Sequence, residues 1–259
     1  MFVYRFVASI GSILDISLID ILLAHLALFF ASIIYTISGF GLGLISIPIL
    51  INIFETKTVV ILINFTTIYL ALLIIRNTKE VIERKEITPV LIFGILGVPF
   101  GVLLIASIDV EPLKVSVLLA IIVISIIGFI QIGNGQPASK YFRYPASFIT
   151  TILITTLGLG TPLLVIVLNK TGLKKNILRK YLAIFGLSVQ LFALIGYVFA
   201  SLISFELFVL LVSVFPTIFI GFKVGNKINL RLNNIIFERF IYMFILISSL
   251  IMLIDILYI

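Results

Sequence analysis

Two glycine-broken apolar stretches, one in each half of the chain, constrain its fold more than any other feature. The first covers residues 38–48 and reads SGFGLGLISIP, and the second covers residues 156–164 and reads TLGLGTPLL. Glycine and proline destabilise a helix and leave backbone polar groups without their usual hydrogen bonds. Hydrocarbon cannot satisfy those groups, so broken backbone persists in a membrane only inside protein or beside a wet cavity. Paired breaks in two halves are typical of a transporter's binding site.

The composition identifies the class of protein. The chain has 259 residues, of which 62% are hydrophobic and 11% charged, and its mean hydropathy is +1.35. A soluble domain of this length could not bury so much apolar surface, so we expect an all-α polytopic membrane protein. Cysteine is absent and His25 is the one histidine, which excludes disulfides and thiolate metal sites. No enzyme motif is present, so we expect no catalytic residue, no metal and no cofactor.

Six apolar segments have the length of about 20 residues that a membrane-spanning helix needs. They are residues 57–75, 88–108, 112–132, 181–200, 205–222 and 240–259. The glycine breaks lie in two further stretches, residues 18–54 and 144–169. This order predicts an N-terminal segment (1–17), a first transmembrane repeat (18–132), a cytoplasmic linker (133–143) and a second transmembrane repeat (144–259).

The two halves match in sequence as well as in layout. Each half consists of one glycine-broken segment followed by three predicted spans. A weak sequence similarity between the halves supports a repeat. The first-half residues Gly41, Gly43, Gly101, Asp109 and Lys114 align with Gly158, Gly160, Gly221, Asn229 and Asn234.

The basic residues predict the orientation. The segments 76–87, 133–143, 169–180 and 223–239 hold four, two, five and four Lys and Arg residues, which is 15 of the 18. All four segments can be cytoplasmic only if the second broken stretch enters and leaves on the same side, as a re-entrant hairpin. The two repeats would then be inverted, with their glycine tips meeting near mid-membrane. The alternative is parallel repeats made of simple spans.

The breaks are also the candidate binding site. A helix that restarts after a glycine presents unpaired N–H groups and the positive end of its dipole, which attract an anion. Hydroxyl groups and prolines accompany the restarts, and two mid-span amides lie elsewhere in the spans. The candidate substrate-binding residues are Gly39, Gly41, Gly43, Ser46, Pro48, Asn64, Gly158, Gly160, Thr161, Pro162 and Gln190. The alternative interpretation is that the glycines only let helices pack closely and that the amides hold helices together.

For other small or titratable residues, a structural role is the simpler interpretation. The glycines at 94, 97 and 101, and the pair at 221 and 225, lie at helical spacing and indicate close contacts between helices. His25 could couple proton movement to transport, or could simply be packed near a helix start.

The first break, with its continuation Pro48-Ile49-Leu50, resembles the glycine-rich and proline motif of the sulfite exporter TauE/SafE family. The basic loop at 76–85 and the glycines at 97 and 101 follow it as they do in that family. The resemblance extends over about residues 21–254, and the second break departs further from the family pattern. It implies transport of sulfur-containing oxyanions or organosulfonates, such as sulfite, often outward.

These observations together predict a secondary transporter of a small anion, most simply an exporter, in the cell membrane. The alternatives are a passive anion channel and a membrane scaffold that transports nothing. The expected partners are the lipid bilayer and a small anionic substrate, with a homodimer left open. Nucleic acid is not expected, because the cations that produce the net charge of +7 lie in short loops, where they determine topology.

Overall fold

The computed structural model describes residues 17–131, 140–169, 173 and 175–229, and those residues form helices and connections without a strand. The first half contains α2 (Leu18–Ser38), α3 (Leu42–Leu50), α4 (Thr56–Asn77), α5 (Arg84–Ser107) and α6 (Val110–Gln131). The second contains the short η1 (Lys140–Phe142), then α7 (Arg143–Leu157), α8 (Thr161–Asn169), α9 (Lys175–Phe199) and α10 (Phe205–Asn229). Within this described part of the chain, five helices, namely α2, α4, α5, α9 and α10, are long and apolar enough to cross a membrane.

Over the described residues, the expected all-helical class with several candidate membrane spans is therefore confirmed. Five of the six predicted spans correspond to α4, α5, α6, α9 and α10, and several of these helices extend past the apolar run into polar residues. The longest extension is in α10, which ends at Asn229 rather than at residue 222, and α9 begins at Lys175 rather than at residue 181. The predicted last span, residues 240–259, lies outside the described residues, as do residues 1–16 and most of the linker.

Each glycine break ends one helix and starts another. Gly39 follows α2 with φ of 82° and donates its N–H to the Tyr35 carbonyl at 2.7 Å. Gly158 follows α7 with φ of 71° and donates to the Ile154 carbonyl at 3.0 Å. Glycine adopts this left-handed conformation without the steric penalty of a side chain, and it commonly ends helices in this way.

This shared geometry makes Gly39 the structural counterpart of Gly158. Two residues later, Gly41 and Gly160 also have positive φ, at 94° and 150°. The sequence alignment had paired Gly41 with Gly158, so the structural correspondence differs from it by two residues. The reason is that the two halves correspond at the left-handed glycine that ends the first helix of each hairpin. A comparison of residue types alone does not detect backbone conformation.

The helices that follow the breaks are short. Both α3 and α8 have nine residues, so each is about 13 Å long, less than half of a hydrocarbon core of about 30 Å. Pro48 lies inside α3, and Pro162 is the second residue of α8, where its missing N–H costs no helical hydrogen bond. The pairs α2–α3 and α7–α8 are called the first and the second hairpin below.

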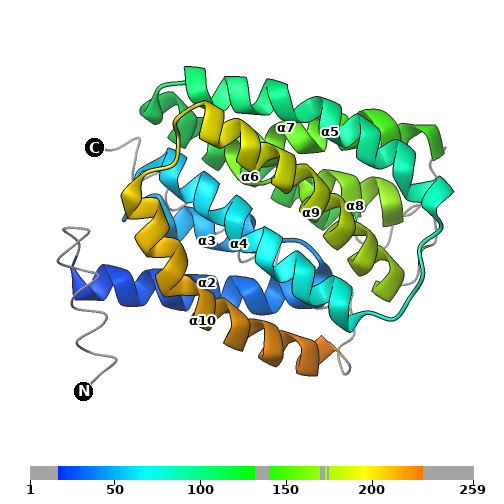
Figure 1. Ribbon diagram of the computed structural model, residues 1–259, viewed down its shortest axis with the longest axis horizontal. Coiled ribbons are helices and arrows are strands. Elements are labelled where there is room, and N and C mark those ends of the chain that lie inside the picture. The colour runs from blue at the N-terminus through cyan, green and yellow to red at the C-terminus, as the bar shows by residue number, and fades with distance from the viewer. Residues whose placement is uncertain (1–16, 132–139, 170–172, 174, 230–259) are drawn as a thin grey trace.

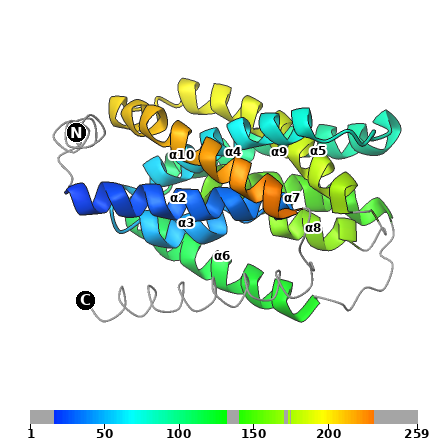
Figure 2. The same cartoon turned by 90° about the horizontal axis from the view of Figure 1, so that it is seen from below.

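The long helices surround these hairpins. In Figure 1, α4 and α9 form a central pair, with α5 and α7 on one side of it and α2 and α10 on the other. Helix α5 also packs against α9, and α10 against α4. Figure 2 shows α6 on the face where α3 and α8 lie, away from the layer that contains α9 and α10. The first hairpin is thus held by a helix from the second half, and the second hairpin by a helix from the first.

Glycines make these two packings close. A Cβ at Gly97 of α5 would lie 2.7 Å from the Phe148 carbonyl oxygen of α7, and one at Gly225 of α10 would lie 2.7 Å from the Ile33 carbonyl oxygen of α2. Gly101 faces Thr155 in the same close manner. The predicted role of these glycines as helix contacts is confirmed, since small residues let two backbones approach in a membrane.

Three of the basic segments meet at one end of the bundle, called the basic end below. Lys180, at the start of α9, donates to the carbonyl oxygens of Thr78 and Glu80 at 2.9 Å and 2.6 Å. Arg179 donates through Nη2 to Oδ1 of Asn226, near the end of α10, at 3.3 Å. Figure 1 shows the start of α7 at this same end, which brings the fourth basic segment there.

These contacts predict that alanine at either close-packed glycine destabilises the protein. Gly97→Ala and Gly225→Ala should each lower the free energy of unfolding by about 1–3 kcal/mol, because a backbone carbonyl cannot move away from the added methyl group. Gly186→Ala is the matched control, since its Cβ would have no neighbour nearer than 3.7 Å. Thermal unfolding in detergent measures the effect, and equal melting temperatures for all three variants would contradict it.

Candidate functional site

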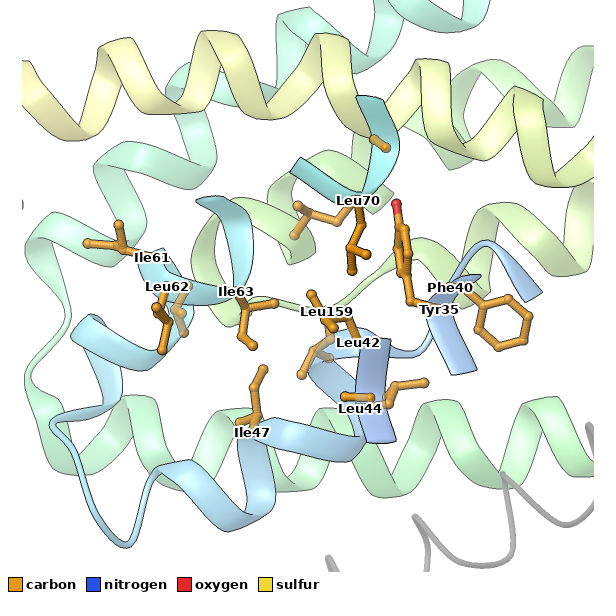
Figure 3. Packing of buried hydrophobic residues seen from close by; sticks show 14 of the residues in the cluster. Tyr35, Phe40, Leu42, Leu44, Ile47, Ile61, Leu62, Ile63, Leu70 and Leu159 are labelled. Carbon is orange, nitrogen blue, oxygen red and sulfur yellow. The ribbon is translucent and has the colours of Figure 1, made fainter. Parts of the chain in front are cut away.

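A small cavity of about 20 Å³ lies where the two glycine breaks meet. That volume is enough for about one water molecule. Both hairpins and the central helices line it, and Figure 3 shows Leu159 of the second break beside Leu42 at the start of α3. The lining residues are Tyr35, Gly41, Leu42, Gly43, Leu44, Ile63, Thr67, Ile154, Gly158, Leu159, Gly160, Thr161, Pro162 and Gln190.

The two breaks touch directly. The Gly158 carbonyl oxygen occupies the space that a side chain at Gly43 would need, so no larger residue fits at Gly43 without separating the hairpins. Ile47 of α3 packs over Gly158, with its Cδ1 2.9 Å from the place of a Cβ there. The glycines therefore serve two purposes, since they break the helices and also let the broken ends approach each other.

The electrostatic field in the cavity comes from backbone. The first intrahelical bond of α3 runs from Ile45 N–H to the Gly41 carbonyl at 3.2 Å, so the N–H groups of the three residues before Ile45 have no acceptor within the helix. The start of α8 lines the same space. Both helices thus direct the positive ends of their dipoles at one point, and no charged side chain is among the described residues that line the cavity.

Gln190 adds a polar side chain. It is 4% exposed, and its Oε1 has no hydrogen-bond partner among the described residues. A buried amide normally satisfies its donors and acceptors, so one that is left without a partner beside a cavity is suited to bind a guest there. Thr67, also in the lining, donates its hydroxyl to the Ile63 carbonyl at 2.8 Å. The unpartnered atom is an amide oxygen, which accepts hydrogen bonds, so donors for an anion here are the backbone N–H groups and the Gln190 Nε2.

The structure gathers seven of the eleven predicted site residues around this cavity. They are Gly41, Gly43, Gly158, Gly160, Thr161, Pro162 and Gln190. The other four, Gly39, Ser46, Pro48 and Asn64, do not line it. Gly39 faces α9, where a Cβ would lie 3.2 Å from the Arg179 Cα. The Ser46 hydroxyl donates to the Leu42 carbonyl at 2.7 Å within its own helix.

Asn64 instead holds the end of α7. Its Nδ2 donates to the Ile154 carbonyl at 3.3 Å and to the Tyr197 hydroxyl at 2.9 Å. Tyr197 in turn donates to the Thr155 carbonyl at 2.7 Å. Both carbonyls belong to the last turn before Gly158, where the Ile154 carbonyl also accepts from the Gly158 N–H and the Thr155 carbonyl relies on its side-chain donor. The pair Asn64–Tyr197 thus positions the tip of the second hairpin.

His25 lies away from the cavity. Its Nδ1 is 2.8 Å from the Ile21 carbonyl oxygen and its Nε2 is 3.2 Å from the Ser213 carbonyl oxygen. It therefore connects α2 to α10. Among the described residues, no three His, Cys, Asp or Glu side chains are grouped so that they could hold a metal ion.

Sequence reasoning did not select Tyr35 or Tyr197. From sequence, a tyrosine in an apolar segment is expected to anchor the helix at the membrane interface, because its hydroxyl usually reaches water there. Here Tyr35 lines the cavity and Tyr197 bonds within the core. One available signal is that Tyr35 precedes Gly39 by four residues, which places its carbonyl under the glycine that ends α2.

Comparison with known proteins identifies the family. A family model described as "Sulfite exporter TauE/SafE" matches residues 24–252, a range that includes both glycine breaks. The chain belongs to the sulfite exporter TauE/SafE family. No curated protein and no solved structure matches the chain. TauE/SafE proteins are membrane transporters of sulfur anions rather than enzymes, so this chain is a multi-pass membrane protein of a transporter class.

The hydrogen bonds around the second tip predict that Tyr197 is needed for stability. Tyr197→Phe leaves the buried Thr155 carbonyl without its side-chain donor, and the free energy of unfolding should fall by about 1–3 kcal/mol. Tyr69→Phe is the control, because Tyr69 makes a ring contact with Phe215 and no hydroxyl bond is seen for it among the described residues. Chemical or thermal unfolding measures both variants, and equal losses would contradict the proposed positioning role.

Proposed function

We propose that this TauE/SafE protein is a secondary transporter that exports a small sulfur oxyanion, with sulfite as the representative substrate. The ion would bind between the glycine breaks. The observation that carries the proposal is that the N-terminal turns of α3 and α8 line one cavity, beside the Gln190 side chain, whose Nε2 can donate. Convergent N–H donors and two positive dipole ends match an oxyanion, whose oxygen atoms are all acceptors.

The absence of a charged side chain from the described lining suits a carrier. A helix N-terminus stabilises an anion by typically 0.3–1 kcal/mol, and by up to about 2 kcal/mol when it is partly buried. Two such ends and a few hydrogen bonds give an affinity that is sufficient for recognition and weak enough for release. A buried Arg or Lys at the same point would hold the ion more strongly and slow its departure.

The cavity is too small for sulfite in this conformation, since its volume of about 20 Å³ accommodates little more than one water molecule. Substrate entry would therefore require the hairpin tips to separate along the contact between Gly43 and Gly158. Movement of one hairpin against the other would open the site to one side of the membrane at a time. This is the alternating access expected of a carrier with discontinuous helices.

We also propose that the two halves are inverted repeats. The packing supports a repeat, because α2 pairs with α10 as α7 pairs with α5. The equivalent left-handed residues Gly39 and Gly158 support it as well. Inversion is supported by direction, since α2 and α7 start at opposite ends of the bundle in Figure 1. Since the basic residues collect at one end, we propose that this end is cytoplasmic and that the protein lies in the cell membrane.

The orientation can be tested with introduced cysteines, because the chain has none of its own. Cysteines at Lys79, Lys140, Lys175 and Lys227 should resist an impermeant thiol reagent in intact cells and react after the cells are opened. A cysteine at Asn52, in the loop between α3 and α4, should react in intact cells. Reaction in intact cells at 175 and 227 but not at 79 and 140 would overturn the inverted arrangement.

Substrate recognition can be tested with purified protein. At about 100 times its dissociation constant, a specific ligand should stabilise the protein by roughly 2.7 kcal/mol. We expect this for sulfite or a related sulfur anion in a thermal-shift series that includes sulfate, thiosulfate, sulfoacetate and simple carboxylates. Gln190→Leu should weaken binding and raise KM about tenfold, as expected from the loss of one buried hydrogen bond to a charged group. Phe192→Leu, at a position on α9 that is exposed in the structure, is the control.

The alternatives give different results in liposomes. A carrier shows saturable uptake and counterflow, whereas a passive channel shows neither. A scaffold shows no ligand-dependent stabilisation and no flux. Normal binding and transport by Gln190→Leu and Gly41→Val together would place the substrate elsewhere, because valine at Gly41 puts branched carbon atoms into the cavity lining.

A further inference from the structure

Arg179 is buried although it lies in the basic segment before the apolar part of α9. Its side chain is 3% exposed, and its backbone packs against Gly39, where a Cβ would lie 3.2 Å from the Arg179 Cα. The residue is therefore next to the first break rather than in a solvated loop. Burying a cation is costly unless it is paired, so its environment needs an explanation.

Its guanidinium is only partly satisfied. Nη2 donates to Asn226 Oδ1 at 3.3 Å, a long bond to a neutral group, and Nε has no partner among the described residues. The acidic side chain that acts on its charge is Glu80, at the basic end. The adjacent Lys180 differs, since its amine donates to two backbone carbonyls. Arg179 is thus a buried cation with unused hydrogen-bonding capacity.

A second unsatisfied group lies at the same helix junction. Thr36 is 0% exposed, and its Oγ1 has no partner among the described residues. It follows Tyr35 in α2 and faces Gly225 of α10, where a Cβ would lie 2.8 Å from the Thr36 Cβ. Gly225 directly precedes Asn226, the residue that Arg179 contacts. The unused donors of Arg179 and Thr36 therefore belong to one junction of α2, α9 and α10.

We propose that Arg179 and Thr36 form a second oxyanion contact, through which the substrate passes between the basic end and the central cavity. This inference rests on the proposed function. A guanidinium binds an oxyanion through parallel N–H bonds, and a threonine hydroxyl can donate to a remaining oxygen. The position supports this role, because the Arg179 Cα lies beside Gly39 at the first break, and the next residue, Lys180, bonds to Thr78 and Glu80 at the basic end. The cavity supplies backbone donors, and Arg179 supplies a buried full charge.

The test compares variants of the full chain in proteoliposomes, with radiolabelled sulfite as the probe. Arg179→Gln should raise KM for sulfite at least about tenfold, the effect of losing one charge-assisted hydrogen bond. Arg179→Lys should recover part of the loss. Asn226→Ala, which removes the structural partner and keeps the cation, should stay within about twofold of wild type. Arg84→Gln removes an exposed charge from the start of α5 and controls for general attraction of anions.

Several outcomes would overturn the inference. One is a KM for Arg179→Gln equal to that of Arg84→Gln, and another is a loss in Asn226→Ala as large as in Arg179→Gln, which would indicate a structural role. If Arg179→Gln does not fold, Thr36→Val decides, because it keeps the cation and the side-chain shape. We expect its KM to rise about threefold or more, and an unchanged KM would overturn the inference. If wild-type protein neither binds nor transports sulfite, the proposed function fails and this inference fails with it.

Discussion

The structure depends on one constraint, which is that backbone polar groups have no water to bond in hydrocarbon. Breaking a helix inside a membrane is tolerable only if protein surrounds the break. Here each break is buried, and each is covered by the other, since Gly43 lies against the Gly158 carbonyl. The same contact that protects the broken backbone also brings two helix starts together. The contact between the two breaks therefore both shields their backbone from lipid and forms the polar site.

The close helix packings follow from that requirement. A hairpin whose second arm is nine residues long cannot anchor itself across the membrane. Helix α10 holds the first hairpin and α5 holds the second, each through glycines placed against backbone carbonyls. Helices α4 and α9 pack between these two pairs, and Asn64 and Tyr197 reach from them to the end of α7. The tips are therefore positioned by helices that are distant in sequence.

The polar chemistry is divided between two places. At the cavity it comes from backbone and amide groups, which can bind an anion without trapping it. The buried charge of Arg179 lies outside that cavity, at the junction toward the basic end. The strong field of Arg179 would attract an anion into the membrane interior, and the weaker field at the cavity would bind it loosely enough for release. This division gives the two regions separate roles in recognition.

The sequence by itself determined the class of protein, the family and the position of both breaks, because hydropathy and glycine spacing are local properties of the chain. It also indicated six cavity-lining residues at the two breaks, since helix starts after a glycine are recognisable without coordinates, and a seventh, Gln190, as a mid-span amide. The tertiary structure alone decided that Ser46 bonds within its own helix, that Asn64 holds α7 and that Tyr35 and Arg179 belong near the site. Those facts depend on which helices meet, and the direction of a side chain follows from packing between distant segments rather than from its neighbours in sequence.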